Sequence, residues 1–146
     1  MKRLFFLLLM TGAIFIVNAQ SSDNESLFIT FPPNSADLKA VTPAQAIQNS
    51  QTFTKVAQLL LNNPQYRILV DGHANPVIRT AIEETETLRP LSQQRAEAAA
   101  DVLVEVYKVD RRRLILSGAG GGFPFGGNNT DLSLNRRVSF FVITPR

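Results

Sequence analysis

Residues 67–75 read RILVDGHAN, an apolar run that ends in small and polar residues. This pattern predicts a strand over residues 66–71, and residues 91–96, LSQQRA, open an alanine-rich helix. Residues 76–90 lie between them and show no period of their own, so we expect a loop there. In α/β folds, ligand sites are often built where a strand end faces a helix start. Binding residues are therefore expected within residues 67–96.

Another helix is predicted ahead of this strand. Thr42 and Pro43 form its start signal, with Thr42 as the N-cap and Pro43 at the first helical position. Pro64 should end it, because a proline ring disfavours helical geometry in the preceding residue. A first strand is expected over residues 27–31. The helix positions expected to face the core are Ile47, Phe53, Val56, Ala57 and Leu60.

Two more strands are predicted behind the second helix. That helix should begin at Ser92, its expected N-cap, and run to about Tyr107. The strands are expected over residues 113–117 and 137–143, separated by a loop rich in glycine, proline and asparagine at residues 118–131. The helix positions expected to face the sheet are Ala96, Ala99, Leu103 and Val106.

The order β-α-β-α-β-β predicts an α+β fold. Two helices should cover one face of a four-stranded mixed sheet, and each β-α-β step should be a right-handed crossover. The long last loop allows the fourth strand to return and pair with an earlier one.

The first residues have the pattern of an export signal. In residues 1–19 a basic start precedes an apolar run at residues 4–17, and small residues follow, as in a secretory signal peptide. The apolar run is shorter than the roughly 20 residues that span a bilayer, so we favour cleavage over a retained membrane anchor. Residues 20–26 are expected to be a flexible lead-in, and residues 27–146 one domain without a transmembrane segment.

Charge and cysteine content exclude several classes of protein. The chain has 15 basic and 12 acidic residues; without Lys2 and Arg3, which lie in the expected signal peptide, 13 basic residues remain and the net charge is +1. This near-neutral charge gives no support for a nucleic-acid partner. The run Arg111–Arg113 has no interleaved aromatic residues, so we interpret it as a solvated turn. The absence of cysteine excludes disulfides and a lipidated cysteine.

Catalytic and metal-binding patterns are weak. His73 is the only histidine, so a zinc site would need a rare ligand set of one imidazole and carboxylates. A Ser-His-Asp arrangement with Ser92 or Ser117 stays open, but no nucleophile-elbow pattern surrounds either serine. The glycine run at residues 118–122 lacks the lysine and the following helix of a phosphate-binding loop. We therefore predict a protein without catalytic activity, metal or cofactor.

Arg95 is the most informative charged residue. It lies in the first turn of the predicted second helix, where the helix dipole does not favour a cation. We expect it to be half-buried near the end of the strand and to pair with a carboxylate, which matches the guanidinium fork. That carboxylate belongs either to a ligand or to the chain itself. The internal candidates are Asp71, Glu83, Glu84 and Glu86.

Several motifs follow one another along the chain: Gly72-His73, Leu91-Ser92-Gln93-Gln94-Arg95-Ala96, Arg113-Leu114, Gly118-Ala119-Gly120, Pro124 and Asn135-Arg136-Arg137-Val138. Together, over residues 28–142, they resemble the OmpA-like domain of bacterial envelopes. The resemblance implies the β-α-β-α-β-β fold, non-covalent binding of peptidoglycan, and a periplasmic location in a cell envelope that has an outer membrane.

The resemblance also implies a binding site. In that family, an aspartate after Gly-His-Thr and the arginine of Leu-Ser-x-x-Arg-Ala hold the diaminopimelate of the peptidoglycan stem peptide. The arginine, leucine and serine are present here. The implied ligand-binding residues are His73, Ala74, Asn75, Leu91, Ser92 and Arg95.

Other family positions are altered. The aspartate is replaced by Asn75, the threonine before it by Ala74, an asparagine by Leu88 and an arginine by Leu132. An asparagine offers the ligand's ammonium only a neutral carbonyl, and losing the charged partner costs about 1–3 kcal/mol. The loop glutamates named above are candidate replacement anions.

Two functions follow from this combination. The first is an envelope module that still binds peptidoglycan through a modified or weakened pocket. The second is a structural or protein-interaction module of the envelope that has lost the ligand, with Phe123-Pro124-Phe125 as an exposed contact patch.

Overall fold

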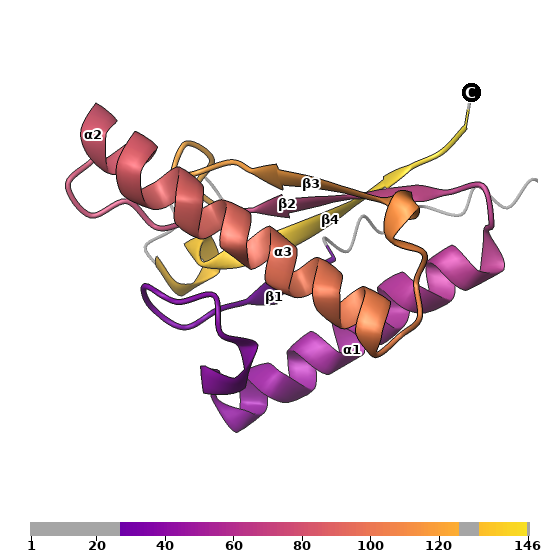
Figure 1. Ribbon diagram of the computed structural model, residues 1–146. Helices are drawn as coiled ribbons and strands as arrows, with labels where there is room; N and C mark the ends of the chain where they lie inside the picture. Colours follow the sequence, from indigo (N-terminus) through magenta and orange to yellow (C-terminus); the bar gives the residue numbers. More distant parts are fainter. Residues whose placement is uncertain (1–26, 126–131, 146) are drawn as a thin grey trace, which may run out of the picture.

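The computed structural model describes residues 27–125 and 132–145 (Figure 1). The expected signal peptide and lead-in lie outside these residues. Within them, no helix combines the length and the apolar character needed to cross a bilayer. The main elements are β1 (Phe28–Thr30), α1 (Pro43–Asn62), β2 (Arg67–Gly72), α2 (Ala81–Glu83), the π-helical η2 (Glu84–Leu88), α3 (Arg89–Glu105), β3 (Leu114–Gly118) and β4 (Arg137–Ile143).

The four strands form one mixed sheet in the order β1-β4-β2-β3. β2 and β3 are parallel, whereas β4 is antiparallel to both β2 and β1. α1 and α3 lie on one face of this sheet (Figure 1). The predicted α+β fold is therefore confirmed, including the return of the last strand into the middle of the sheet.

α1 begins as predicted. Thr42 is its N-cap and forms a reciprocal capping box with Gln45, and the helix ends at Asn62 before Pro64. Its buried stripe is Asn49, Phe53, Val56 and Leu60, at helical spacing. The prediction that Ile47 faces the core is wrong: its side chain is 62% exposed, because it lies on the opposite side of the helix from Asn49.

Asn49 is a polar member of this stripe with a specific partner. Its Oδ1 accepts a hydrogen bond from the N–H of Thr30 (3.0 Å), and its Nδ2 donates to the C=O of the same residue (2.9 Å). A buried amide needs such partners. These two bonds fix α1 against β1.

α3 lies unusually close to the sheet. Ala96, Ala99 and Leu103 are buried as predicted, but Val106 is 67% exposed because the helix ends at Glu105. A Cβ added to Gly72 would lie 1.9 Å from the carbonyl oxygen of Ser92. Only a glycine in β2 leaves room for the helix backbone at this point.

The segment before α3 differs from the prediction. Residues 81–88 are helical, and α2, η2 and α3 form one continuous helix whose first end projects beyond the sheet (Figure 1). Its N-cap is Thr80, whose Oγ1 accepts from the N–H of Glu83 (3.1 Å), and not Ser92. Pro90 lies inside this helix, where it lacks an N–H and crowds the preceding turn. The wide π-helical turn at η2 comes directly before it and accommodates that disruption.

Candidate functional site

Arg95 is at the centre of the family motif and is completely buried, with 0% exposure. The prediction that it is half-buried is therefore wrong. Its Nε donates to the C=O of Ser35 (2.9 Å), one terminal nitrogen to that of His73 (2.8 Å), and the other to that of Pro32 (3.1 Å). The guanidinium also lies 5.5 Å from the ring centroid of Phe31. Arg95 thus joins the β1–α1 connection to the end of β2.

The charge of Arg95 has no internal counter-ion in residues 27–125 and 132–145. Burial lowers its pKa to about 10, and the neighbouring charge of Arg136 acts in the same direction. The guanidinium therefore remains protonated at neutral pH. Its neutral partners supply dipoles, but they do not cancel the positive charge.

The four candidate internal partners of Arg95 all bind elsewhere or remain at the surface. Asp71 lies beside His73, Glu83 binds the loop before α2, and Glu84 pairs with Arg89. Glu86 is exposed. The predicted salt bridge within the chain is therefore not found among the described residues.

Ser92 and Ala74 hold the glycine-rich loop. The Ser92 hydroxyl accepts from the N–H of Gly120 (2.9 Å) and donates to the C=O of Arg89 (2.8 Å). The N–H of Ala74 donates to the C=O of Gly120 (2.9 Å). Both residues are buried, whereas Leu91 is half-buried. In this conformation Ser92 and Ala74 position the backbone around the site.

Asn75, at the position of the family aspartate, contacts a second asparagine. Its Oδ1 accepts from Nδ2 of Asn135 (3.3 Å), and Oδ1 of Asn135 accepts from the N–H of Phe125 (2.8 Å). The amide of Asn75 therefore links the end of β2 to the segment before β4. A carboxylate at position 75 would keep the same acceptor.

His73 is buried beside Asp71, with its Nε2 3.3 Å from Oδ2. Burial raises the pKa of Asp71, but the neighbouring side chains of His73 and Ser117 outweigh that effect and lower it overall. Ser117 thus contacts the carboxylate, and the Ser92 hydroxyl is engaged with backbone groups, so neither forms a nucleophile–base pair with His73. The described residues also hold no group of side chains suited to bind a metal.

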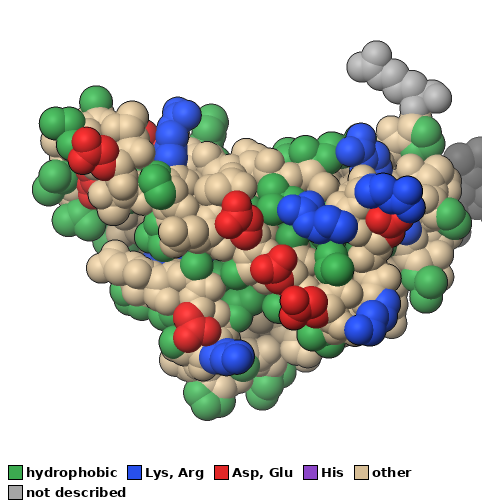
Figure 2. Space-filling view, in the orientation of Figure 1, with side chains coloured by type: hydrophobic (Ala, Val, Ile, Leu, Met, Phe, Trp, Pro, Cys, Tyr) green, Lys and Arg blue, Asp and Glu red, His purple; other side chains and the backbone are tan. Residues whose placement is uncertain are grey.

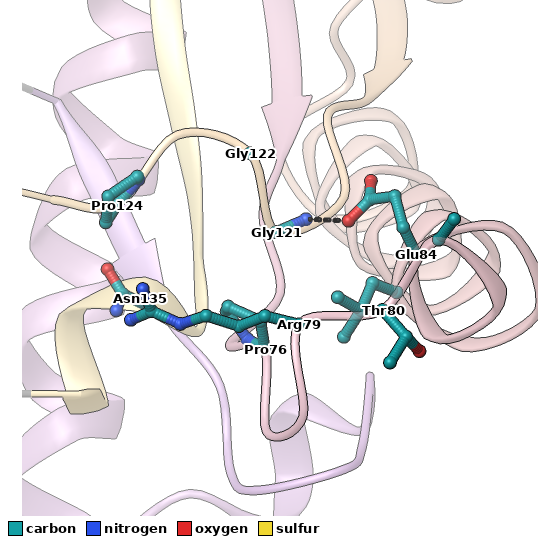
Figure 3. Close-up of a pocket in the computed structure, with 10 residues that line it drawn as sticks. Pro76, Arg79, Thr80, Glu84, Gly121, Gly122, Pro124 and Asn135 are labelled. Atoms are coloured by element: carbon teal, nitrogen blue, oxygen red, sulfur yellow. Dashed lines mark hydrogen bonds between the residues drawn. The ribbon is translucent and has the colours of Figure 1, made fainter.

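A pocket of about 520 Å³ opens next to these residues (Figure 3). It lies between the loop after β2, the projecting helix and the glycine-rich loop. None of the six implied ligand-binding residues lines it. Its lining residues are Pro76, Arg79, Thr80, Ala81, Glu84, Leu88, Gly121, Gly122, Pro124 and Asn135.

Glu84 fixes one wall of this pocket. Its carboxylate accepts from the N–H of Gly121 (3.0 Å) and lies 3.4 Å from Nε of Arg89. A Cβ on Gly120, which has a φ of +64°, would collide with the same carboxylate. The glycine-rich loop is therefore anchored at this point by specific contacts.

The sequence contains a helix-start signal for this wall of the pocket, which apolar periodicity does not reveal. Thr80-Ala81-Ile82-Glu83 matches the pattern of a capping box, a helix-start signal. It predicts a helix directly after Arg79, and therefore places Glu84 in a first helical turn.

Solved structures with the same fold come from bacterial envelope proteins. The peptidoglycan-associated lipoprotein from Burkholderia pseudomallei is 23% identical, with a TM-score of 0.63, covering 84% of this chain and 98% of that one. The C-terminal domain of Helicobacter pylori MotB is 22% identical, with a TM-score of 0.59 and coverages of 81% and 86%. The OmpA-like domain of FopA1 from Francisella tularensis is 20% identical, with a TM-score of 0.63 and coverages of 81% and 71%. Identities this low show a shared fold.

Sequence comparison gives a more specific result. No curated protein matches the chain. The model of the OmpA family, however, matches residues 30–137, which run from the last residue of β1 to the first residue of β4 and include both long helices. This chain therefore belongs to the OmpA family.

Proposed function

We propose that this domain is a non-enzymatic module of the cell envelope that binds peptidoglycan non-covalently through the diamino acid of the stem peptide. The observation that carries the proposal is the unneutralised charge of Arg95. Its guanidinium meets three carbonyl oxygens but no carboxylate of the described chain, and Arg136 adds a second positive charge nearby. A buried positive charge without an internal anion favours a ligand carboxylate close by.

The implied ligand-binding residues keep distinct parts in this proposal. Arg95 supplies positive potential, whereas Ser92, Ala74 and His73 hold the surrounding backbone by the hydrogen bonds described above. The relatives with this fold include a protein called the peptidoglycan-associated lipoprotein. The proposed location is the periplasm, with residues 1–19 as the export signal.

Asn75 makes the proposed pocket weaker than the family pattern implies. A charge-assisted hydrogen bond is roughly twice as strong as a neutral one. Asn75 binds Asn135, which lines the pocket, so a ligand ammonium in this region has a neutral amide nearby where the family has a carboxylate; this loses about 1–3 kcal/mol, which is about ten- to a hundredfold in affinity.

Retention on purified sacculi tests the proposal. The wild-type protein should be retained, and Asn75→Asp should lower its apparent Kd about ten- to a hundredfold, because it restores an anion at the end of β2. The new carboxylate still accepts the hydrogen bond from Asn135, so the fold should be preserved. Gln51→Glu, on the exposed side of α1, is the matched control for the added charge.

Two results would count against the proposal. Failure of sacculi to retain the wild-type protein would remove peptidoglycan as the ligand. Equal retention of Asn75→Asp and Gln51→Glu would show that the charge at position 75 does not affect binding of the diamino acid.

A structural or protein-interaction module of the envelope is the second candidate. Val77, Ile78 and Ile82 are 76%, 69% and 68% exposed, and hydrophobic side chains gather at the projecting helix end in Figure 2. The suggested Phe123-Pro124-Phe125 patch is only partly exposed, since the Phe125 ring packs 5.2 Å from that of Phe28. This candidate predicts that intact sacculi do not retain the wild-type protein.

A further inference from the structure

The pocket carries opposite charges on its two sides. Figure 3 shows the guanidinium of Arg79 reaching towards Asn135, whereas the carboxylate of Glu84 lies across the pocket beside Gly121. Arg79 is exposed, and no described residue forms a hydrogen bond or ion pair with its guanidinium. The pocket therefore presents a cation without a partner and, separated from it, an anchored anion.

The backbone under Arg79 is held in an unusual conformation. Its φ is +57°, a left-handed value that costs a non-glycine residue about 1–3 kcal/mol. The carboxylate of Glu83 maintains it by accepting from the N–H groups of Val77 (2.8 Å), Ile78 (3.0 Å) and Arg79 itself (2.6 Å). The loop is therefore built around an internal anion that directs Arg79 along the pocket.

The carboxylate of Glu84 has hydrogen-bond acceptor positions left for a ligand. A carboxylate offers about four acceptor positions, and the contacts with Gly121 and Arg89 use two of them. The lining also includes the carbon side chains of Pro76, Leu88 and Pro124. This combination matches an aliphatic chain with an ammonium at one end and a carboxylate at the other.

We infer that this pocket binds the free side-chain ammonium of the diamino acid at Glu84 and a carboxylate of the same stem peptide at Arg79. The inference rests on the proposed function and assigns the direct charged contacts to residues outside the family motif. Because the two charges lie on opposite sides of the pocket, the ligand's charged groups must be separated by several bonds. A stem peptide whose amine has been acylated by cross-linking lacks the ammonium and should bind less tightly.

Three small probes separate the two contacts. Nα-acetyl-L-lysine has both the ammonium and the carboxylate, Nα,Nε-diacetyl-L-lysine lacks the ammonium, and Nα-acetyl-L-lysine amide lacks the carboxylate. In NMR titrations of the purified protein, the first probe should bind at least about tenfold more tightly than either of the others.

Two neutral variants should each remove the preference of the protein for one charged group of the probe. Arg79→Gln should bind the acid and its amide equally, because it cannot distinguish a carboxylate. Glu84→Gln should bind the amine and its acetylated form equally, while its amide oxygen still accepts from the N–H of Gly121 and keeps the loop in place. The matched controls are Arg67→Gln and Glu86→Gln, which change exposed residues outside the pocket and should keep both preferences.

The outcomes separate this inference from the proposed function. Wild-type protein that binds the three probes equally, or variants that keep both preferences, would overturn the inference. If sacculi retained the wild-type protein in that case, the protein would still bind peptidoglycan, but through residues other than Arg79 and Glu84. If the preferences followed Arg79 and Glu84 as expected but sacculi did not retain the protein, the pocket would stand and peptidoglycan would not be its ligand.

Discussion

One continuous helix crosses two different environments in this domain. The α3 part lies against the sheet, where Ser92, Arg95 and Ala96 are fully buried. The α2 part projects beyond the sheet, with Ile82 exposed and the pocket on its flank. The packed part determines where the helix lies, whereas α2 contributes no buried residue to the core.

The same contrast holds for two arginines on either side of this division. Arg95 belongs to the family motif, and its side chain is fully buried, with each guanidinium nitrogen donating to a backbone carbonyl group. Arg79 lies in the loop before α2, and its side chain is available to solvent and ligand. The motif residue Arg95 therefore serves the architecture of the site, and in the inferred binding mode the neighbouring loop supplies a charged contact.

The largest expected effect comes from replacing the buried arginine. Arg95→Met should lower the free energy of unfolding by about 2–5 kcal/mol, because it leaves the carbonyls of Pro32, Ser35 and His73 without their donors. Arg79→Met should change it by less than about 0.5 kcal/mol, as expected for an exposed residue. Urea unfolding at neutral pH measures both. A similar loss in the free energy of unfolding in both variants would show that Arg95 and Arg79 do not differ in their contribution to the fold.

The close approach of α3 to the sheet gives the next effect. Gly72→Ala should destabilise the protein by about 1–3 kcal/mol or more, since its Cβ would collide with the backbone of Ser92. Gly122→Ala should change stability by less than about 0.5 kcal/mol, because nothing lies within 4 Å of the added Cβ. Thermal unfolding of the two variants tests this difference, and a stable Gly72→Ala protein would show that the helix can move away.

The smallest effect should be confined to the loop before α2. Hydrogen bonds from the N–H groups of Val77, Arg79 and Ile78 lower the pKa of Glu83 below its ordinary value of 4.5. A lowered pKa means that the folded loop favours the ionised carboxylate, so its stabilisation is complete above pH 4.5 and is lost as the pH falls through the lowered pKa.

Amide exchange measures this loop directly. At neutral pH, Glu83→Gln should reduce the protection of the amides at residues 77–79 without changing global stability, whereas Glu86→Gln should leave their protection unchanged. Wild-type protection at these amides should fall at acidic pH. Unchanged protection in Glu83→Gln would show that the carboxylate does not hold the loop.

Much of the fold was predictable because its signals are local. Thr42 and Pro43 identified the start of α1, and the bounds of β4, Arg137–Ile143, were predicted correctly. The helix at residues 81–88 was missed because residues 76–90 show no apolar period, although a π-helical turn allows the helix to continue past Pro90. Asn49 was missed as a core position because a polar residue interrupts the apolar period.

The candidate site was less predictable, since it depends on contacts between distant segments. The burial of Arg95 requires carbonyl groups from Pro32, Ser35 and His73, and no periodicity within a helix indicates them. Glu84 meets Gly121 only after the glycine-rich loop has folded against the projecting helix. Sequence motifs therefore identified the region of the site, but not the side chains that line its pocket.

Asn49 has a consequence for how separate molecules behave at high concentration. Among the described residues β1 pairs with β4 on one side only, so its other side is an edge of the described sheet. There the amide of Asn49 binds the N–H and C=O of Thr30 in the way that a fifth strand would. This contact occupies the groups that an incoming strand from another chain needs, and so protects that edge against strand addition and aggregation.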